Sequence, residues 1–280
     1  MRVLHSFWTN AYFQGRWGTE TKVIQDLYCF ALSYHFAKEN FGEIHLVTDR
    51  EGLSLLDFLE YDSISTGLDA LHHVDPRCWT AGKIKAAQEQ TGDFLHIDGD
   101  VFLIDPIIKD LVSSSYDAIV QMREVGHHFE STYPPIFRDL KKIYPYIDYI
   151  SLYNFTYNTG IFGFKDQEFK AEYCRSYFEL LWDLQDHGIK FPAERDPNIV
   201  IEQSLLTTMA QNQNKHIKEL ITLEDMSKWD LFGAAERIGF VHLWGNSKYQ
   251  DYWQEIVRMR LKKENPELIK RVEEKIANYF

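Results

Sequence analysis

Short apolar runs alternate with longer amphipathic segments through the first half of the chain. Each run ends at polar or turn-forming residues, which is typical of a buried strand. These runs predict strands at residues 3–8, 43–48, 61–65, 94–97 and 116–121. Apolar side chains recur at helical spacing between them, at residues 21–38, 54–58 and 79–90. Strands and helices that alternate in this way indicate βαβ units, and therefore an α/β fold with a mainly parallel sheet.

The second half resumes the alternation after a stretch of different character. Residues 122–157 are rich in tyrosine and contain two adjacent prolines, which favours an insertion over a further domain. Beyond that stretch, the pattern predicts strands at 157–164 and 240–244, and helices at 169–185 and 199–209.

A charged helical segment follows from residue 251 and breaks near Pro266. We therefore expect one domain over residues 1–250 and a helical tail over residues 251–280. The tail is expected to pack on this domain, or on a second subunit in a homo-oligomer.

Composition narrows the classes of partner. The net charge of −12 over 280 residues repels a phosphate backbone, so we expect no binding to nucleic acid. The three cysteines include no closely spaced pair, which argues against a disulfide framework or a CxxC zinc site. The first residues lack the apolar core of a signal peptide, and no window approaches the ~20 apolar residues of an integral membrane segment. We expect a soluble, cytoplasmic protein.

Asp98 and Asp100 follow the apolar strand at 94–97 and are separated by Gly99. On a flat strand their side chains would lie about 6.6 Å apart, too far to share an ion with bonds of about 2.1 Å. We therefore expect a turn in which Gly99 adopts a positive φ. Two close carboxylates repel each other, and a bound Mg²⁺ or Mn²⁺ reverses the sign of that interaction. The alternative is a solvated pair, because Asp-Gly is a common turn sequence.

Other polar groups follow other predicted strands. Thr9, Asn10 and Asp49 stand at strand ends, where the ligands of parallel sheets usually bind. His242 lies in the last predicted strand, and Gly245 and Lys248 follow it at three-residue intervals. The imidazole can complete a metal site, the glycine lets the backbone approach a diphosphate, and the lysine can neutralise its charge. The alternative for His242 is a satisfied core histidine.

Four short motifs therefore occur in a definite order: Asp98-Gly99-Asp100, Asn158-Thr159-Gly160, Glu202-Gln203 and His242-x-x-Gly245-x-x-Lys248. In this order they resemble the motifs of the GT-A fold glycosyltransferases, and most of all the retaining, glycogenin- and galactosyltransferase-like group. The resemblance spans about residues 1–250. It implies a GT-A, Rossmann-like sheet, mixed but mainly parallel, that is flanked by helices and followed by a C-terminal helical extension.

The resemblance also implies an activity. The enzyme would move a sugar from a nucleotide diphosphate sugar, with UDP as the expected nucleotide, to a hydroxyl group of a carbohydrate or glycan acceptor. Asp98, Asp100 and His242 would bind Mn²⁺ or Mg²⁺, and either aspartate could also touch the ribose. Gly245 and Lys248 would hold the donor diphosphate. Residues 122–157 would lie on the acceptor side.

Further residues receive roles through the same resemblance. Those at the nucleoside-binding edge are Thr9, Asn10, Tyr12 and Asp49. Asn158 and Gly160 would lie under the donor sugar, and Lys83 would contact the sugar or a phosphate. Gln203 would face the anomeric carbon.

The chain departs from this group at two motifs. Glu202-Gln203 replaces the usual Asp-Gln, and Tyr249-Gln250 follows the lysine where Pro-Trp is usual. Retention, with Gln203 steadying the oxocarbenium-like state, is therefore the expectation, and inversion with Glu202 as the base is the alternative. Two other functions fit parts of the pattern: a haloacid dehalogenase-like phosphatase with Asp98 as nucleophile, and a non-catalytic nucleotide-sugar-binding protein.

Overall fold

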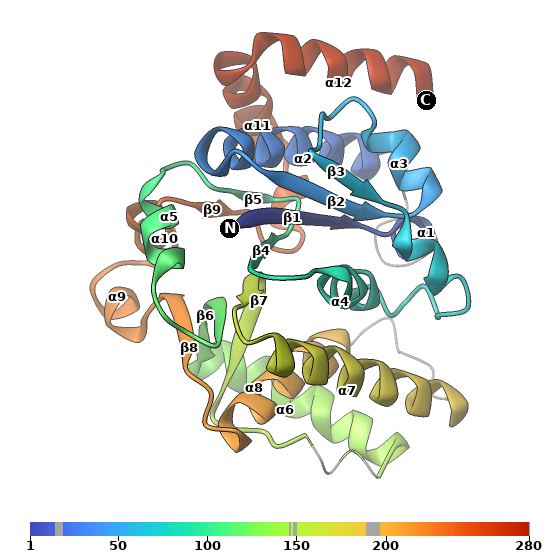
Figure 1. Ribbon diagram of the computed structural model, residues 1–280, viewed down its shortest axis with the longest axis vertical. Helices are drawn as coiled ribbons and strands as arrows, with labels where there is room; N and C mark the ends of the chain where they lie inside the picture. Colours follow the sequence, from blue (N-terminus) through green and yellow to red (C-terminus); the bar gives the residue numbers. More distant parts are fainter. Residues whose placement is uncertain (15–18, 146, 148–149, 189–196, 280) are drawn as a thin grey trace.

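A computed structural model describes residues 1–14, 19–145, 147, 150–188 and 197–279. Its centre is a seven-stranded sheet with the strand order β3-β2-β1-β4-β7-β6-β8 (Figure 1). In chain order these strands are β1 (Arg2–Phe7), β2 (Ile44–Thr48), β3 (Ser63–Ser65), β4 (Phe94–Ile97), β6 (Ala118–Val125), β7 (Phe155–Phe164) and β8 (Ile217–Ile221). Strand β7 runs antiparallel to both of its neighbours, and the other pairs are parallel. The mixed, mainly parallel sheet is confirmed.

Helices cover both faces of this sheet, and each face has its own hydrophobic core. One layer contains α2 (Glu20–Phe41), α11 (Asp251–Glu264) and α12 (Pro266–Tyr279) (Figure 1). The other contains α4 (Thr80–Glu89), α6 (Gly126–Ile143), α7 (Gln167–Asp186) and α8 (Leu205–Asn212). Alternation in β1 serves both layers, because Val3 packs in the first core and Leu4 in the second.

Shorter elements complete the domain. They are the helices α1 (Thr9–Gln14), α3 (Arg50–Leu56), α5 (Ile107–Ser113), α9 (Leu223–Lys228) and α10 (Leu231–Ile238). A small antiparallel sheet pairs β5 (Val101–Phe102) with β9 (Val241–His242). This sheet brings residues 100 and 242 together and so places the two halves of the candidate site side by side.

Several elements differ from the sequence pattern. The stretch at 122–157 is largely ordered: β6 runs on to Val125, α6 occupies most of the remainder and β7 begins at Phe155. Residues 146, 148 and 149 of this stretch lie outside the described residues. The pattern missed α6 because Pro134 and Pro135 lie inside it, and proline removes a helical hydrogen-bond donor. It also missed β8, which is only partly buried.

The tail after residue 250 packs on its own domain. Leu268, Ile269 and Val272 of α12 are buried in the core that α2 also lines. Association of two chains through this tail stays a prediction. Among the helices of the described residues, none is both long enough and apolar enough to cross a membrane.

Candidate active site

Asp98 and Asp100 lie on a tight turn at the end of β4. The backbone N–H of Val101 donates to the carbonyl oxygen of Asp98 at 3.0 Å, which closes the turn. The predicted positive φ at Gly99 is wrong, because Gly99 is not among the described glycines with positive φ. Its role is steric: a Cβ there would lie 2.5–2.7 Å from ring atoms of Phe30 in α2. The glycine therefore lets the acidic turn pack directly against that helix.

The turn brings both aspartates to His242. One ligand atom from each of Asp98, Asp100 and His242 lies within 4.8 Å of the others. Nδ1 of His242 lies 2.8 Å from the side-chain oxygen of Gln121 in β6, so Nδ1 carries the donated proton. Nε2 then keeps its lone pair and lies 3.4 Å from Oδ1 of Asp100. Two electron-rich atoms that face each other at this distance can share a cation.

Gly160 in β7 makes the space that His242 occupies. A Cβ at residue 160 would lie 2.3 Å from Cε1 of His242 and 2.7 Å from Oε1 of Gln121. The carbonyl oxygen of Gly160 also accepts the backbone N–H of Asp98 at 3.0 Å. This glycine therefore supports two of the three candidate metal ligands from behind.

Lys248 contributes a buried positive charge beside the same cluster. Its Nζ lies 3.0 Å from Oδ2 of Asp100 and 3.5 Å from Oδ1 of Asp26. Burial alone would lower the pKa of Lys248, but these two carboxylates outweigh burial and raise it well above its ordinary value. Burial likewise raises the pKa of Asp100, yet the Lys248 ammonium holds it below its usual range. The ammonium and the carboxylate are therefore both charged at neutral pH.

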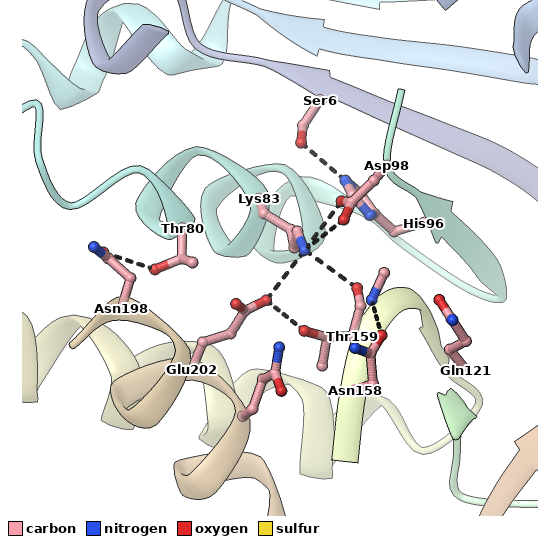
Figure 2. A network of polar contacts seen from close by, with 12 residues as sticks. Ser6, Thr80, Lys83, His96, Asp98, Gln121, Asn158, Thr159, Asn198 and Glu202 are labelled. Carbon is pink, nitrogen blue, oxygen red and sulfur yellow. Dashed lines mark hydrogen bonds and ion pairs between the residues drawn. The ribbon is translucent and has the colours of Figure 1, made fainter. Parts of the chain in front are cut away.

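Lys83 forms a second charged network, which also includes Asp98 (Figure 2). Its Nζ lies 3.0 Å from Oδ1 of Asp98 and 3.4 Å from Oε1 of Glu202, and it donates to the carbonyl oxygen of Thr159 at 3.2 Å. Burial lowers the pKa of Lys83, but the two carboxylates prevail and raise it to about 12. The same lysine therefore orients Asp98 and neutralises the fully buried Glu202.

Residues of both charged networks line one cavity of about 330 Å³. The residues predicted as site residues that line it are Tyr12, Lys83, Asp98, Asp100, Asn158, His242, Gly245 and Lys248. Gly245 has φ +55 and nothing within 4 Å of its Cβ position. A ligand can therefore approach the backbone at this residue.

Six predicted site residues are not among the described residues that line the cavity: Thr9, Asn10, Asp49, Gly160, Glu202 and Gln203. Oδ2 of Asp49 accepts from the backbone N–H and the hydroxyl of Thr9 at 2.9 and 2.7 Å, and its Oδ1 caps α3. These contacts fix the strand ends next to the cavity. Glu202 and Gln203 lie on a π-helical turn, Val200–Ser204, a feature that often marks a functional site.

Gln203 belongs to a buried polar network behind the cavity. The Tyr133 hydroxyl lies 2.6 Å from Oε1 of Gln203 and 2.6 Å from Oε2 of Glu124, and Asn158 donates to Glu124 at 2.6 Å. Through Asn158 this network reaches the cavity wall. The sequence pattern did not indicate Glu124. It predicted that this strand ends at residue 121, whereas β6 continues to Val125.

Other cavity residues were also missed. Asp26 looks like an ordinary polar position on a helix, and Trp8, Trp79 and Trp244 look like core aromatics. The high aromatic content, 15% of the chain, was the one feature of the sequence that pointed to aromatic side chains lining a cavity.

The donor set fits a divalent cation. Two carboxylates and one imidazole offer oxygen and nitrogen ligands, which suit Mn²⁺ or Mg²⁺. When ionised, the four acids Asp26, Asp98, Asp100 and Glu202 exceed the two lysines, Lys83 and Lys248, by two negative charges. A divalent cation held by Asp98, Asp100 and His242 would balance that excess.

Solved glycosyltransferase structures align with this chain at low sequence identity. The solved apo structure of the bifunctional glycosyltransferase WbbM aligns with a TM-score of 0.54 at 10% identity, over 97% of this chain and 51% of that chain. The galactosyltransferase LgtC in complex with donor and acceptor sugar analogs aligns at 0.45 and 8% identity, over 94% of this chain and 100% of that chain. Mouse xyloside xylosyltransferase 1 aligns at 0.41 and 10% identity, over 78% and 84% of the two chains.

The likeness to WbbM, together with the strand order, defines the class: the chain has a GT-A glycosyltransferase-like fold. No curated protein matches the sequence. The chain belongs to a family of unknown function (DUF6734), whose sequence profile matches residues 1–275.

Proposed function

We propose that this protein is a metal-dependent glycosyltransferase that moves a sugar from a nucleotide diphosphate sugar, with UDP as the nucleotide, to an acceptor hydroxyl. The observation that carries the proposal is the cluster of Asp98, Asp100 and His242 with Lys248 held 3.0 Å from Asp100. It combines a candidate cation site with a fixed positive charge in one cavity, at the end of a central strand of a GT-A-like sheet.

In this proposal the charged residues act on the leaving diphosphate. Lys248 stabilises the negative charge that develops as the glycosidic bond breaks, because its ammonium is already buried and oriented. Gly245 admits the diphosphate to backbone distance. A bound divalent cation would add Lewis-acid stabilisation of the same leaving group. The side chains of Asp98, Asp100 and His242 would hold that cation in place.

The donor sugar would lie toward Lys83 and Asn158, which also line the cavity. Tyr12 would contribute to the nucleoside edge, with Thr9, Asn10 and Asp49 fixing the strand ends beneath it. Gln203 would face the anomeric carbon from the π-helical turn. Residues 122–157 would bound the acceptor side.

Retention is the proposed outcome. Inversion needs a free base opposite the leaving group. Glu202 is fully buried, accepts from the Thr159 hydroxyl at 2.8 Å and is paired with Lys83. Burial raises its pKa and Lys83 opposes that shift. A carboxylate committed to these partners is poorly placed to take a proton from an acceptor, which argues against inversion with Glu202 as the base.

The test is calorimetric titration of UDP with and without Mn²⁺, using the wild-type chain, Asp100→Asn and His242→Ala. We expect Mn²⁺-dependent binding that both variants weaken. Asp139→Asn, in a surface ion pair with Lys142, is the matched control and should bind as the wild type does. Equal and negligible UDP binding in both conditions would refute the proposal.

Turnover assays distinguish between the remaining candidate functions. UDP release from UDP-sugars over a panel of glycan acceptors would support transfer. Retained binding without any turnover would instead favour a non-catalytic binding protein. Phosphatase activity that Asp98→Asn abolishes would favour the haloacid dehalogenase-like alternative, which uses that residue as the nucleophile.

A further inference from the structure

Asp26 is a buried carboxylate on the apolar side of α2. Its neighbours along the helix, Val23, Leu27 and Phe30, belong to the hydrophobic core. The Asp26 side chain is only 7% exposed, yet it reaches the cavity and lies 3.5 Å from Nζ of Lys248. A lone acid in such surroundings is costly unless it is paired and hydrogen-bonded, so its presence calls for a specific partner.

The second oxygen of Asp26 is held in place. Oδ2 accepts hydrogen bonds from the hydroxyls of Tyr12 and Tyr249, the latter at 2.8 Å. Gln254 of α11 donates to the backbone carbonyl of Lys248 at 2.5 Å, which fixes the main chain from which the lysine extends. The carboxylate and the ammonium are therefore both held in position before any ligand arrives.

Asp100 divides its two oxygens between two cationic positions. Oδ1 faces Nε2 of His242 at 3.4 Å, where a divalent cation would bind, and Oδ2 faces Lys248 at 3.0 Å. A cation at the first position repels the ammonium and also draws on the charge of Asp100. Lys248 then needs a second negative charge to stay next to the metal, and the carboxylate of Asp26, 3.5 Å from its Nζ, supplies one.

We propose that Asp26 is a positioning residue: its fixed negative charge holds Lys248 at the diphosphate subsite when Asp100 is shared with a divalent cation. This inference rests on the proposed function, because it takes Lys248 as the diphosphate contact. Asp26 acts through Lys248, and it touches neither the sugar nor the reacting bond.

The experiment measures binding of inorganic pyrophosphate at saturating Mn²⁺ to the full chain. A double-mutant cycle compares wild type, Asp26→Asn, Lys248→Met and the double variant. We expect Asp26→Asn to weaken pyrophosphate binding about tenfold, at the lower end of effects for residues that orient a ligand. In the Lys248→Met background the same substitution should change the affinity by less than about twofold. If Asp26 had a merely structural role, Asp26→Asn would lower the pyrophosphate affinity equally in both backgrounds.

Thermal unfolding of each variant is followed in parallel. If Asp26→Asn does not fold, Tyr249→Phe replaces it in the cycle, because it removes one hydrogen bond from Asp26 and leaves the charge in place. A smaller loss that again requires Lys248 is expected.

Pyrophosphate affinity that is unchanged or increased in Asp26→Asn would overturn the inference, as would an equal loss in both backgrounds. A wild-type chain that binds no pyrophosphate with Mn²⁺ would also overturn it. A wild-type chain that binds pyrophosphate but no nucleoside diphosphate would contradict the proposed function alone, and the cycle would still decide the role of Asp26.

Discussion

Gly160→Ala should disable the candidate metal site without altering any ligand atom. The added Cβ would lie 2.3 Å from Cε1 of His242, whereas ordinary contact between carbons is about 3.5 Å. The imidazole must therefore move by about 1.2 Å, several times the ~0.2 Å tolerance of a metal–ligand distance. We expect Mn²⁺ affinity to fall about 10- to 100-fold, and the free energy of unfolding to fall by about 1–3 kcal/mol from overpacking.

The assay combines Mn²⁺ titration, followed by the electron paramagnetic resonance signal of the free ion, with unfolding in urea. In a His242→Ala background the ring is gone, so adding Gly160→Ala should change Mn²⁺ affinity by less than about twofold. Gly163→Ala is the matched control in the same strand, because its Cβ would meet the carbonyl oxygen of Phe94 instead of His242. It should destabilise the fold and leave the Mn²⁺ affinity of folded protein intact. Unchanged Mn²⁺ affinity in Gly160→Ala would refute the reasoning.

Three further predictions concern stability. Gly99→Ala forces the acidic turn away from α2 and should lower the free energy of unfolding by about 1–3 kcal/mol; an unshifted urea midpoint would contradict this. Lys83→Met leaves Glu202 buried without its counter-charge and should cost about 3–5 kcal/mol, and the double variant with Glu202→Gln should recover part of that loss, measured in the same urea series. The hydrogen bond to Glu124 raises the pKa of His128. The pair therefore stabilises the fold at pH values below the ordinary histidine pKa of 6.5. This stabilisation is lost as the pH rises through the raised pKa of His128. The stability difference between wild type and His128→Ala should therefore shrink between about pH 6 and pH 8, and a difference that is independent of pH would count against the pairing.

Much of the fold could be predicted because its signals are local. Apolar runs at strand spacing gave the central strands, and the polar residues that end them gave Asp98 and Asp100. His242 and Lys248 could be found because a short strand, a glycine and a lysine follow one another within a few residues. The structure brings all four side chains to one cavity.

The remaining features depend on contacts between distant segments. Asp26 is indistinguishable in sequence from a solvated helix position, and its partners come from the packing of α2 against Tyr12 and residues 248 and 249. The sequence pattern assigned Gly99 a backbone role. The structure instead requires a glycine there because the ring of Phe30, in α2, leaves no room for a Cβ. Tertiary contacts of this kind leave no periodic trace in the chain.

The pairing of β5 with β9 also has a consequence for how the protein matures. Val101 pairs with His242 across about 140 residues of chain, and the N–H of Leu243 donates to the carbonyl oxygen of Asp100 at 3.1 Å. Contacts so distant in sequence form late, because a long loop must close before they stabilise anything. During synthesis the acidic turn emerges long before its histidine and lysine partners. Binding of a metal ion at this site would therefore coincide with the completion of folding. A partly synthesised chain would contain Asp98 and Asp100 but would lack His242 and Lys248.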